Sequence, residues 1–400
     1  MDSRLYWIWL AQALGPGNRV MSALLAQYTT AAGVYRADSA GLRQCGLSPT
    51  LVRRLKDHSL DEAQDILDRT LHAGDWVLTP EDALYPLCLR RLEDMPAALY
   101  CRGTLLPMDD HPAIAVVGTR RATSQGMREA FAMAAGLAAG GMAVVSGGAV
   151  GIDAAAHEGA LYAGGKTVLV LACPLTEHYP LENEDLRRRI VDAGGVLVSE
   201  YPPDRPCKCV YPVRNRLMVG FSRGVCMAET PMRSGARISA RLARENAVDV
   251  YAMPGALAGH HNDGAHREIR GGATLVTRAT DIIDEYLPLY PDRLDVSAAQ
   301  EMQDRLEKRD TMPRPERARR SQEGRLLPPM TAVPPTRSTL PEDASADAKS
   351  VYAVLTETPQ PVDELAEKCA LPIPTLLVAL TELEMYGCAA NSAGQRYYRI

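Results

Sequence analysis

AIAVVGTRRATSQG (Ala113–Gly126) places a short β-branched run directly before a glycine and a polar turn, which then opens a helical stretch. Strands that alternate with helices indicate βαβ units and a parallel sheet. The core, residues 83–286, is therefore predicted to be an α/β domain with an extended Rossmann-like, doubly wound parallel sheet. The same rhythm recurs in six further runs: MAVVSGG (Met142–Gly148), TVLVLAC (Thr167–Cys173), GVLVSE (Gly195–Glu200), GVCMAE (Gly224–Glu229), DVYAMPG (Asp249–Gly255) and ATLVT (Ala273–Thr277).

Three other regions surround these strands, and an irregular bridge over residues 83–110 leads into them. Residues 1–75 show helical apolar spacing broken by Gly/Pro turns, which is typical of a SAM-like or helix-hairpin-helix-like domain. Both a DNA-contacting and a purely packing role are open for that domain. Residues 287–345 are rich in Pro, Arg and Glu and are predicted to be a disordered linker. Residues 346–400 contain three helical stretches and a hairpin, which indicates a winged helix.

Composition limits the class of protein. The net charge of −5 argues against a protein coated in basic surface, but it permits a local basic groove. Nine cysteines without a regular framework suit a reducing cytosol, so a cytoplasmic protein without a membrane span is predicted. Between Pro112 and Tyr286 only two lysines occur among many arginines. Arginine suits phosphate contacts, although a GC-rich genome would produce the same bias.

Two loops follow strands at positions where doubly wound sheets bind their ligands. In the first loop, Gly118 permits close backbone approach, Thr119 offers a hydroxyl, and Arg120 and Arg121 supply charge. In the second, SGGAVGIDAAAHEGAL (Ser146–Leu161), Gly148 is one of three glycines whose amides can point outward. Asp153 and His157 follow on one helical face, and the favoured interpretation is that the histidine hydrogen-bonds Asp153 and holds the loop.

A third loop, RPCKCVYPVRNR (Arg205–Arg216), carries four cations, no acid and one aromatic residue. A cation beside an aromatic ring is what a nucleic-acid single strand needs, because phosphates are neutralised while bases stack. The candidate contacts are Lys208, Tyr211, Arg214, Asn215 and Arg216. A fourth loop, SGARISARLAREN (Ser234–Asn246), adds Arg237. Cys207 and Cys209 lack a second ligand pair nearby, so no metal site is predicted.

Catalytic motifs are missing from these loops. The sequence shows no Walker lysine motif, no GxSxG elbow and no HExxH pair. The prediction is therefore a non-catalytic protein without cofactor that binds single-stranded DNA. Two alternatives stay open, namely a nucleotide hydrolase with Asp153 and Glu200 as acids, and a Rossmann-type nucleotide sensor.

Seven motifs, among them VGTRRATSQG, YPVRNRLMVGFS and GAHREIRGGATLV, resemble the DNA-processing protein A (DprA/Smf) family over residues 83–286. The resemblance implies a homodimer that binds single-stranded DNA and loads the RecA recombinase in natural transformation, without catalysis. The single-strand-binding protein is a further candidate partner. The family's phosphate loop falls on Gly118, Thr119 and Arg120, its lysine and stacking aromatic on Lys208 and Tyr211, and its arginine-asparagine-arginine run on Arg214, Asn215 and Arg216.

This chain departs from the family pattern at four places. Thr119 stands where serine is usual, which keeps the hydroxyl, and Tyr211 replaces the usual phenylalanine, which keeps the stacking face. SGARISA carries Arg237 where an apolar residue is common, and GAHREI carries His266 and Arg267 where polar and apolar residues are usual. The last domain is also unusual in charge, with seven acidic residues against four basic ones from Ala346 to Ile400. Its expected recognition helix, Pro374–Tyr386, has no basic residue. Duplex reading normally needs arginine or lysine there, so we predict a protein-contact module.

Overall fold

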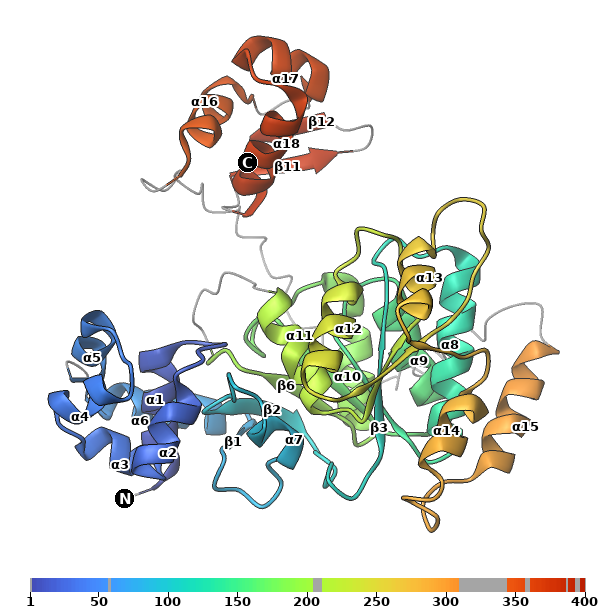
Figure 1. Ribbon diagram of the computed structural model, residues 1–400, viewed down its shortest axis with the longest axis horizontal. Helices are drawn as coiled ribbons and strands as arrows, with labels where there is room; N and C mark the ends of the chain where they lie inside the picture. Colours follow the sequence, from blue (N-terminus) through green and yellow to red (C-terminus); the bar gives the residue numbers. More distant parts are fainter. Residues whose placement is uncertain are drawn as a thin grey trace, which may run out of the picture. The chain divides into compact units, whose positions relative to one another are not determined.

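The computed structural model describes residues 2–56, 59–203, 211–308, 344–356, 360–385, 388–392 and 396–399. It divides into two compact units, Met1–Glu316 and Arg317–Ile400. Each unit is described by itself below (Figure 1). Among the described residues, no helix combines the length and apolar character that crossing a membrane requires.

The first unit is built around a mixed sheet whose described strands lie in the order β1-β2-β6-β5-β4-β3-β7-β8-β9. All seven strands predicted from the sequence are present and pair in parallel. Most of their residues are buried, as expected for β-branched runs covered by helices on both faces. The predicted strands are β3 (Ala113–Val117), β4 (Ala143–Ser146), β5 (Thr167–Leu171), β6 (Val196–Ser199), β7 (Gly224–Met227), β8 (Asp249–Ala252) and β9 (Thr274–Leu275).

Helices cover both faces of this sheet, which confirms the doubly wound α/β fold. Along β3, Ile114 and Val116 belong to one hydrophobic cluster, whereas Ala113, Ala115 and Val117 belong to the other. The first cluster includes helices α8 (Ser124–Ala139), α9 (Ile152–Tyr162) and α14 (Ala279–Tyr286). The second includes α10 (Glu184–Asp192), α11 (Tyr211–Gly220), α12 (Ala236–Glu245) and α13 (Asp263–Arg270). A short 3-10 helix, η1 (Leu181–Asn183), precedes α10.

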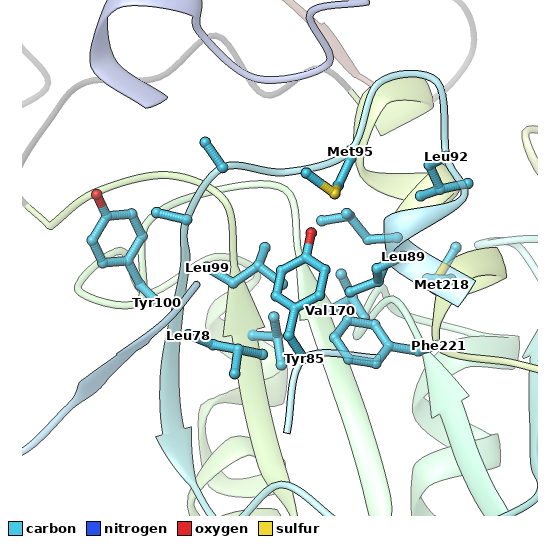
Figure 2. Close-up of a cluster of buried hydrophobic side chains, with 14 of the residues drawn as sticks. Leu78, Tyr85, Leu89, Leu92, Met95, Leu99, Tyr100, Val170, Met218 and Phe221 are labelled. Carbon is cyan, nitrogen blue, oxygen red and sulfur yellow. The ribbon is translucent and has the colours of Figure 1, made fainter. Parts of the chain in front are cut away.

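The predicted irregular bridge is partly wrong, because it contributes to the sheet. Strand β2 (Leu99–Gly103) pairs antiparallel with β6, and β1 (Trp76–Leu78) pairs antiparallel with β2. Between them lies helix α7 (Leu87–Arg90). The Tyr85 hydroxyl donates to the Pro96 carbonyl at 2.8 Å. Figure 2 shows how the bridge packs on the core, with Tyr85 among Leu89, Leu99, Val170 and Phe221.

The predicted disordered linker is wrong over part of its length. Helix α15 (Val296–Glu307) begins where Asp295 accepts a hydrogen bond from the Ala298 amide at 3.0 Å. Ala299 joins the cluster formed by α8 and α14, and the Gln303 side chain accepts from the Ala279 amide at 2.9 Å. Residues 309–343, the rest of the predicted linker apart from residues 344–345, lie outside the described residues.

The predicted N-terminal helices are confirmed. They share one hydrophobic cluster with β1, β2 and the sheet, so the N-terminal region and the core form a single compact unit. The Ser22 hydroxyl, for example, donates to the Glu93 carbonyl in the bridge at 3.1 Å. The helices are α1 (Arg4–Leu14), α2 (Met21–Tyr28), α3 (Ala31–Arg36), α4 (Ser39–Gln44), α5 (Pro49–Lys56) and α6 (Asp61–His72).

The second unit has the predicted winged-helix organisation. Its helices are α16 (Ala346–Val354), α17 (Val362–Cys369) and α18 (Ile373–Met385). Its strands β10 (Gln360–Pro361), β12 (Arg396–Arg399) and β11 (Ala389–Ser392) form a sheet in that order. A separate core that includes Leu365, Leu376 and Leu380 holds the helices together.

Candidate functional site

A groove lies at the point where the chain reverses its direction of travel across the sheet. The chain runs outward from β3 through β4, β5 and β6, then returns to pair β7 with the other side of β3. Crevices at the carboxyl ends of strands beside such a reversal are the usual ligand sites of open α/β sheets. The groove has a volume of about 510 Å³, and it is lined by the turn after β3 and by the first turns of α9, α11 and α12.

The turn after β3 is held in place by its backbone. The Thr119 amide donates to the Glu229 carbonyl at 2.8 Å, and the Ile152 amide donates to the Thr119 carbonyl at 3.2 Å. A Cβ atom on Gly118 would lie 2.5 Å from Ile152 Cγ1, so only glycine fits this position. The predicted residues Gly118, Thr119, Arg120 and Arg121 therefore form a fixed edge of the groove.

The N-terminus of α8 is already occupied by an acid of the protein itself. Thr123 caps the helix by accepting from the Gly126 amide at 3.0 Å. The Glu229 carboxylate accepts from the Thr123 amide at 2.9 Å and also contacts the Thr123 hydroxyl. Because a carboxylate satisfies the positive end of this helix, α8 does not offer its first turn to an external phosphate.

Arg120 and Tyr211 form the mouth of the groove. The Arg120 guanidinium carbon lies 4.2 Å from the centroid of the Tyr211 ring, in a cation–π contact. Burial of the half-buried ring, together with a hydrogen bond to Tyr179, raises the pKa of Tyr211 to about 12. Arg121 is exposed, and it has no acidic partner among the described residues. The mouth thus presents two guanidinium groups beside one neutral aromatic ring.

Arg214 lies on the floor of the same groove and is 5% exposed. Its guanidinium donates to the carbonyls of Gly147 and Val170. A side chain on Gly147 would collide with that guanidinium, which explains the glycine there. Burial lowers the pKa of Arg214 and raises that of Asp153, while each charge favours the ionised form of the other. The floor is therefore a buried cation with a nearby buried carboxyl group.

Of the next two predicted contacts, one lies in the groove and the other points into the protein. The Asn215 side chain lines the groove and donates to the Gly235 carbonyl at 3.4 Å. Arg216 is 2% exposed, and its guanidinium contacts both carboxylate oxygens of Glu200 at 2.6 Å and Asp94 at 3.2 Å. Arg216 does not line the groove. It ties α11 to the end of β6 and to the bridge.

His157 is structural, as the favoured interpretation held, but its expected partner is wrong. Its Nδ1 lies 2.7 Å from the Thr167 hydroxyl, which itself donates to the Val144 carbonyl at 2.6 Å. The hydroxyl has one hydrogen, so Nδ1 of His157 is the donor to Thr167. Complete burial lowers the pKa of His157 to about 3, so the ring is neutral. Asp153 instead accepts from the Ala149 amide at 3.4 Å.

Three other predicted residues have different outcomes. Gly148 has a φ of +67°, its carbonyl accepts from the Asn183 side chain at 2.9 Å, and it lines a small pocket of about 40 Å³ beside the groove. Arg237 does not line the groove, because its Nε pairs with Glu268 at 2.9 Å. Lys208, with Cys207 and Cys209, lies outside the described residues.

The structure also adds residues that the motifs did not reveal. Arg233 is exposed and lines the groove immediately before the SGAR segment, and its position next to that motif was the available signal. Tyr179 bonds to Tyr211, although nothing in the sequence around Tyr179 indicated that contact. Among the described residues, no group of three His, Cys, Asp or Glu side chains is placed to hold a metal ion.

The charges of the groove favour a polyanion. Of the described residues that line it, Arg120, Arg121, Arg214 and Arg233 are basic, and Asp153 is the single acid. Within a concave surface, charge of one sign raises the local concentration of the opposite ion. The guanidinium groups can therefore neutralise phosphates, and the aromatic ring beside them can stack a base.

Comparisons with known proteins agree with this architecture. Residues 76–287 match the sequence profile of the family described as DNA recombination-mediator protein A, and residues 332–395 match that of the DprA winged helix domain. Protein Smf from Synechocystis is 28% identical over 409 aligned residues, covering 100% of this chain and 99% of that protein. DNA processing protein DprA from Streptococcus pneumoniae is 39% identical over 205 residues, covering 51% of this chain and 72% of that protein.

A solved structure shares the fold. The X-ray structure of DNA processing protein A from Streptococcus pneumoniae matches with a TM-score of 0.62 and 30% sequence identity. The match covers 71% of this chain and 99% of that one.

Proposed function

This chain belongs to the DNA recombination-mediator protein A family, and from that premise we propose that it binds single-stranded DNA in the groove beside β3 without catalysing a reaction. We further propose that it acts in the cytoplasm as a homodimer that protects incoming single strands and loads RecA during natural transformation. The single-strand-binding protein is a further candidate partner. The RecA, dimer and cytoplasmic parts of this proposal are supported by family membership, and no described residue is assigned to them.

The observation that carries the proposal is the mouth of the groove, where Arg120 lies over the Tyr211 ring and the exposed Arg121 follows on the same turn. Arg233 supplies a further exposed charge, and Arg214 lies below them. Arginine contacts to phosphates give affinity without sequence preference, whereas an aromatic face can stack an unpaired base. In a duplex the base faces are already stacked, so this combination favours a single strand.

The Arg120–Tyr211 contact indicates how a strand enters. With its guanidinium over the ring, Arg120 covers one face of Tyr211. When a phosphate binds Arg120, the guanidinium can turn toward it and release that face for a base. Thr119, fixed by its bonds to the Glu229 and Ile152 backbone, keeps the start of this turn in place during the exchange.

The acids that a nucleotide hydrolase would need are engaged in structural contacts. Glu200 is buried and bonded to Arg216. Asp153 is buried beside Arg214 and accepts a backbone hydrogen bond. A general acid or base must reach its substrate, but Glu200 does not line the groove, and Asp153, which does, already accepts from the Ala149 amide. These contacts support binding over hydrolysis.

Fluorescence anisotropy tests the proposal. It measures the binding of labelled oligothymidylate to the full chain, with and without a mononucleotide competitor. We expect binding of the strand that weakens steeply with salt and that a mononucleotide displaces poorly. Tight binding of a mononucleotide without binding of long strands would instead identify a nucleotide sensor. Stimulation of RecA strand exchange, measured on the same preparation, tests the loading role.

A further inference from the structure

A second basic surface lies beside the groove, on the exposed sides of α12 and α13. It forms a hollow with a volume of about 570 Å³. Its lining includes five arginines and a single acid, Glu268. We call it the α12–α13 surface, and its arginines are Arg233, Arg237, Arg241, Arg244 and Arg267.

Glu268 holds this surface in shape. The carboxylate is 8% exposed, and it accepts from Arg237 Nε at 2.9 Å through one oxygen and from Arg244 Nη1 at 2.6 Å through the other. Although burial opposes ionisation, the two guanidinium groups hold the pKa of Glu268 below its ordinary value. One acid therefore fixes two arginines and leaves their combined charge positive.

The other three arginines keep most of their charge available. Among the described residues, neither Arg233 nor Arg267 has an acidic partner, and both are exposed. Arg241 lies 3.7 Å from Glu245, four residues along the helix, with both side chains largely exposed. Exposed ion pairs of this kind contribute little to stability, so Arg241 can readily exchange Glu245 for another anion. The surface thus has an excess of free guanidinium groups, which suit phosphate oxygens.

This surface is continuous with the groove. Arg233, Ser234 and Ile238 line both. Two of the places where the sequence departs from the family pattern lie together on this surface. Arg237 pairs with Glu268, which belongs to the GAHREI segment. We propose that the α12–α13 surface binds the phosphate backbone of the same DNA single strand where it leaves the groove. This inference rests on the proposed function. The shared lining favours a continuing strand over an acidic protein segment as the occupant.

The full chain is tested with oligothymidylates of two lengths, one of about 4 nucleotides, near the lower limit of single-strand sites, and one of about 30 that extends beyond the groove. The double variant R241A/R267A removes two exposed arginines from the surface without touching the groove lining. We expect it to bind the short strand like the wild type and the long strand on the order of fivefold more weakly. For the long strand, the slope of log K against log salt concentration should decrease in magnitude by about 1.4.

A matched control is R293A/R305A, which removes two exposed arginines beside Leu294 and Leu306, residues of the hydrophobic cluster on the opposite face of the sheet. It should leave both affinities unchanged. Equal long-strand affinity and salt slope in R241A/R267A and the wild type would overturn the inference while the groove stands. Loss of poly-glutamate binding without loss of DNA affinity would also overturn it and identify an acidic protein ligand. If the wild type binds neither strand, the proposed function itself fails.

Discussion

The groove mouth and the interior just behind it carry the same residue types with opposite roles. At the mouth, Arg120 and Arg121 are exposed, and Arg120 stacks on Tyr211. In the interior, five residues after Tyr211, Arg216 is buried between Glu200 and Asp94. The positive charges of the mouth arginines are available to a ligand, whereas the charge of Arg216 is neutralised inside the protein. A basic run in a sequence is therefore no measure of basic surface.

The largest expected effect comes from removing the interior arginine. Arg216→Ala leaves Glu200 buried without its guanidinium partner, and uncompensated buried charges of this kind cost about 3–5 kcal/mol in stability. Urea unfolding of the variant and the wild type measures this loss. Arg121→Ala is the matched control, and the free energy of unfolding should change by less than about 0.5 kcal/mol.

The same pair of variants tests the comparison from the binding side. Arg121→Ala should lower the salt slope of single-strand binding by about 0.7, because one phosphate contact is lost. If Arg216→Ala folds with wild-type stability and loses DNA affinity, Arg216 is a DNA contact as the sequence motif predicted, and the division between mouth and interior is wrong.

Tyr211 gives the next effect, on binding alone. Tyr211→Ala should cost about 1–3 kcal/mol of single-strand affinity, because a stacking face is lost. The salt slope should stay at its wild-type value, since the ring neutralises no phosphate. Tyr211→Phe serves as the control and should retain most of the affinity. A fall in the slope for Tyr211→Ala would show that the ring acts by positioning Arg120 instead.

His157 tests the interior through pH. Its pKa is near 6.5 in an unfolded chain and about 3 in the fold, so the unfolded state binds the proton first on acidification. Stability from this group is complete above pH 6.5 and is lost as the pH falls toward 3. His157→Asn keeps an N–H donor for Thr167 without titrating.

Between about pH 7.5 and 5.5, the wild type should therefore lose about 1.4 kcal/mol more than His157→Asn, as measured by urea unfolding at both pH values. Any cavity left by the smaller side chain contributes equally at the two pH values and cancels in the difference. Identical pH dependence in the two proteins would mean that the ring is hydrated and titrates normally.

The sequence was sufficient for features that local patterns determine. Six of the seven parallel strands are mostly buried apolar runs, and β9, although exposed, continues the alternation of strands with helices, so all seven were predicted. Strand β2 was missed because its pairing depends on β6, almost 100 residues later in the chain. Helix α15 was missed because it buries few residues, among them Ala299 and the polar Gln303, and so lacks an apolar pattern.

The residues of the candidate site also fall into two groups, those that local patterns predict and those that depend on distant partners. Gly118, Thr119, Arg120 and Tyr211 were predicted because the turn after a strand and the start of a helix are local features. The direction of Arg216 depends on Glu200 and Asp94, and the partner of His157 is Thr167 on a neighbouring strand. Such partners are set by packing between distant segments, which spacing along one segment does not encode.

The smallest expected effect comes from the winged helix, which extends the comparison to a second region. Unlike the groove lining, residues 346–400 have more acidic than basic residues, and α18 contains no arginine or lysine. Few phosphate contacts can form there, so a chain that ends at Glu316 should bind single-stranded DNA within a few-fold of the full chain. Anisotropy titrations with the long oligothymidylate measure this ratio. Substituting Arg396 and Arg399 in the full chain is the control, and it should likewise change little. A large loss of affinity on truncation, with no loss in a chain that lacks residues 346–400 alone, would instead place part of the DNA interface in the arginine-containing segment 317–345. A large loss in both shortened chains would place it in the winged helix despite its charge.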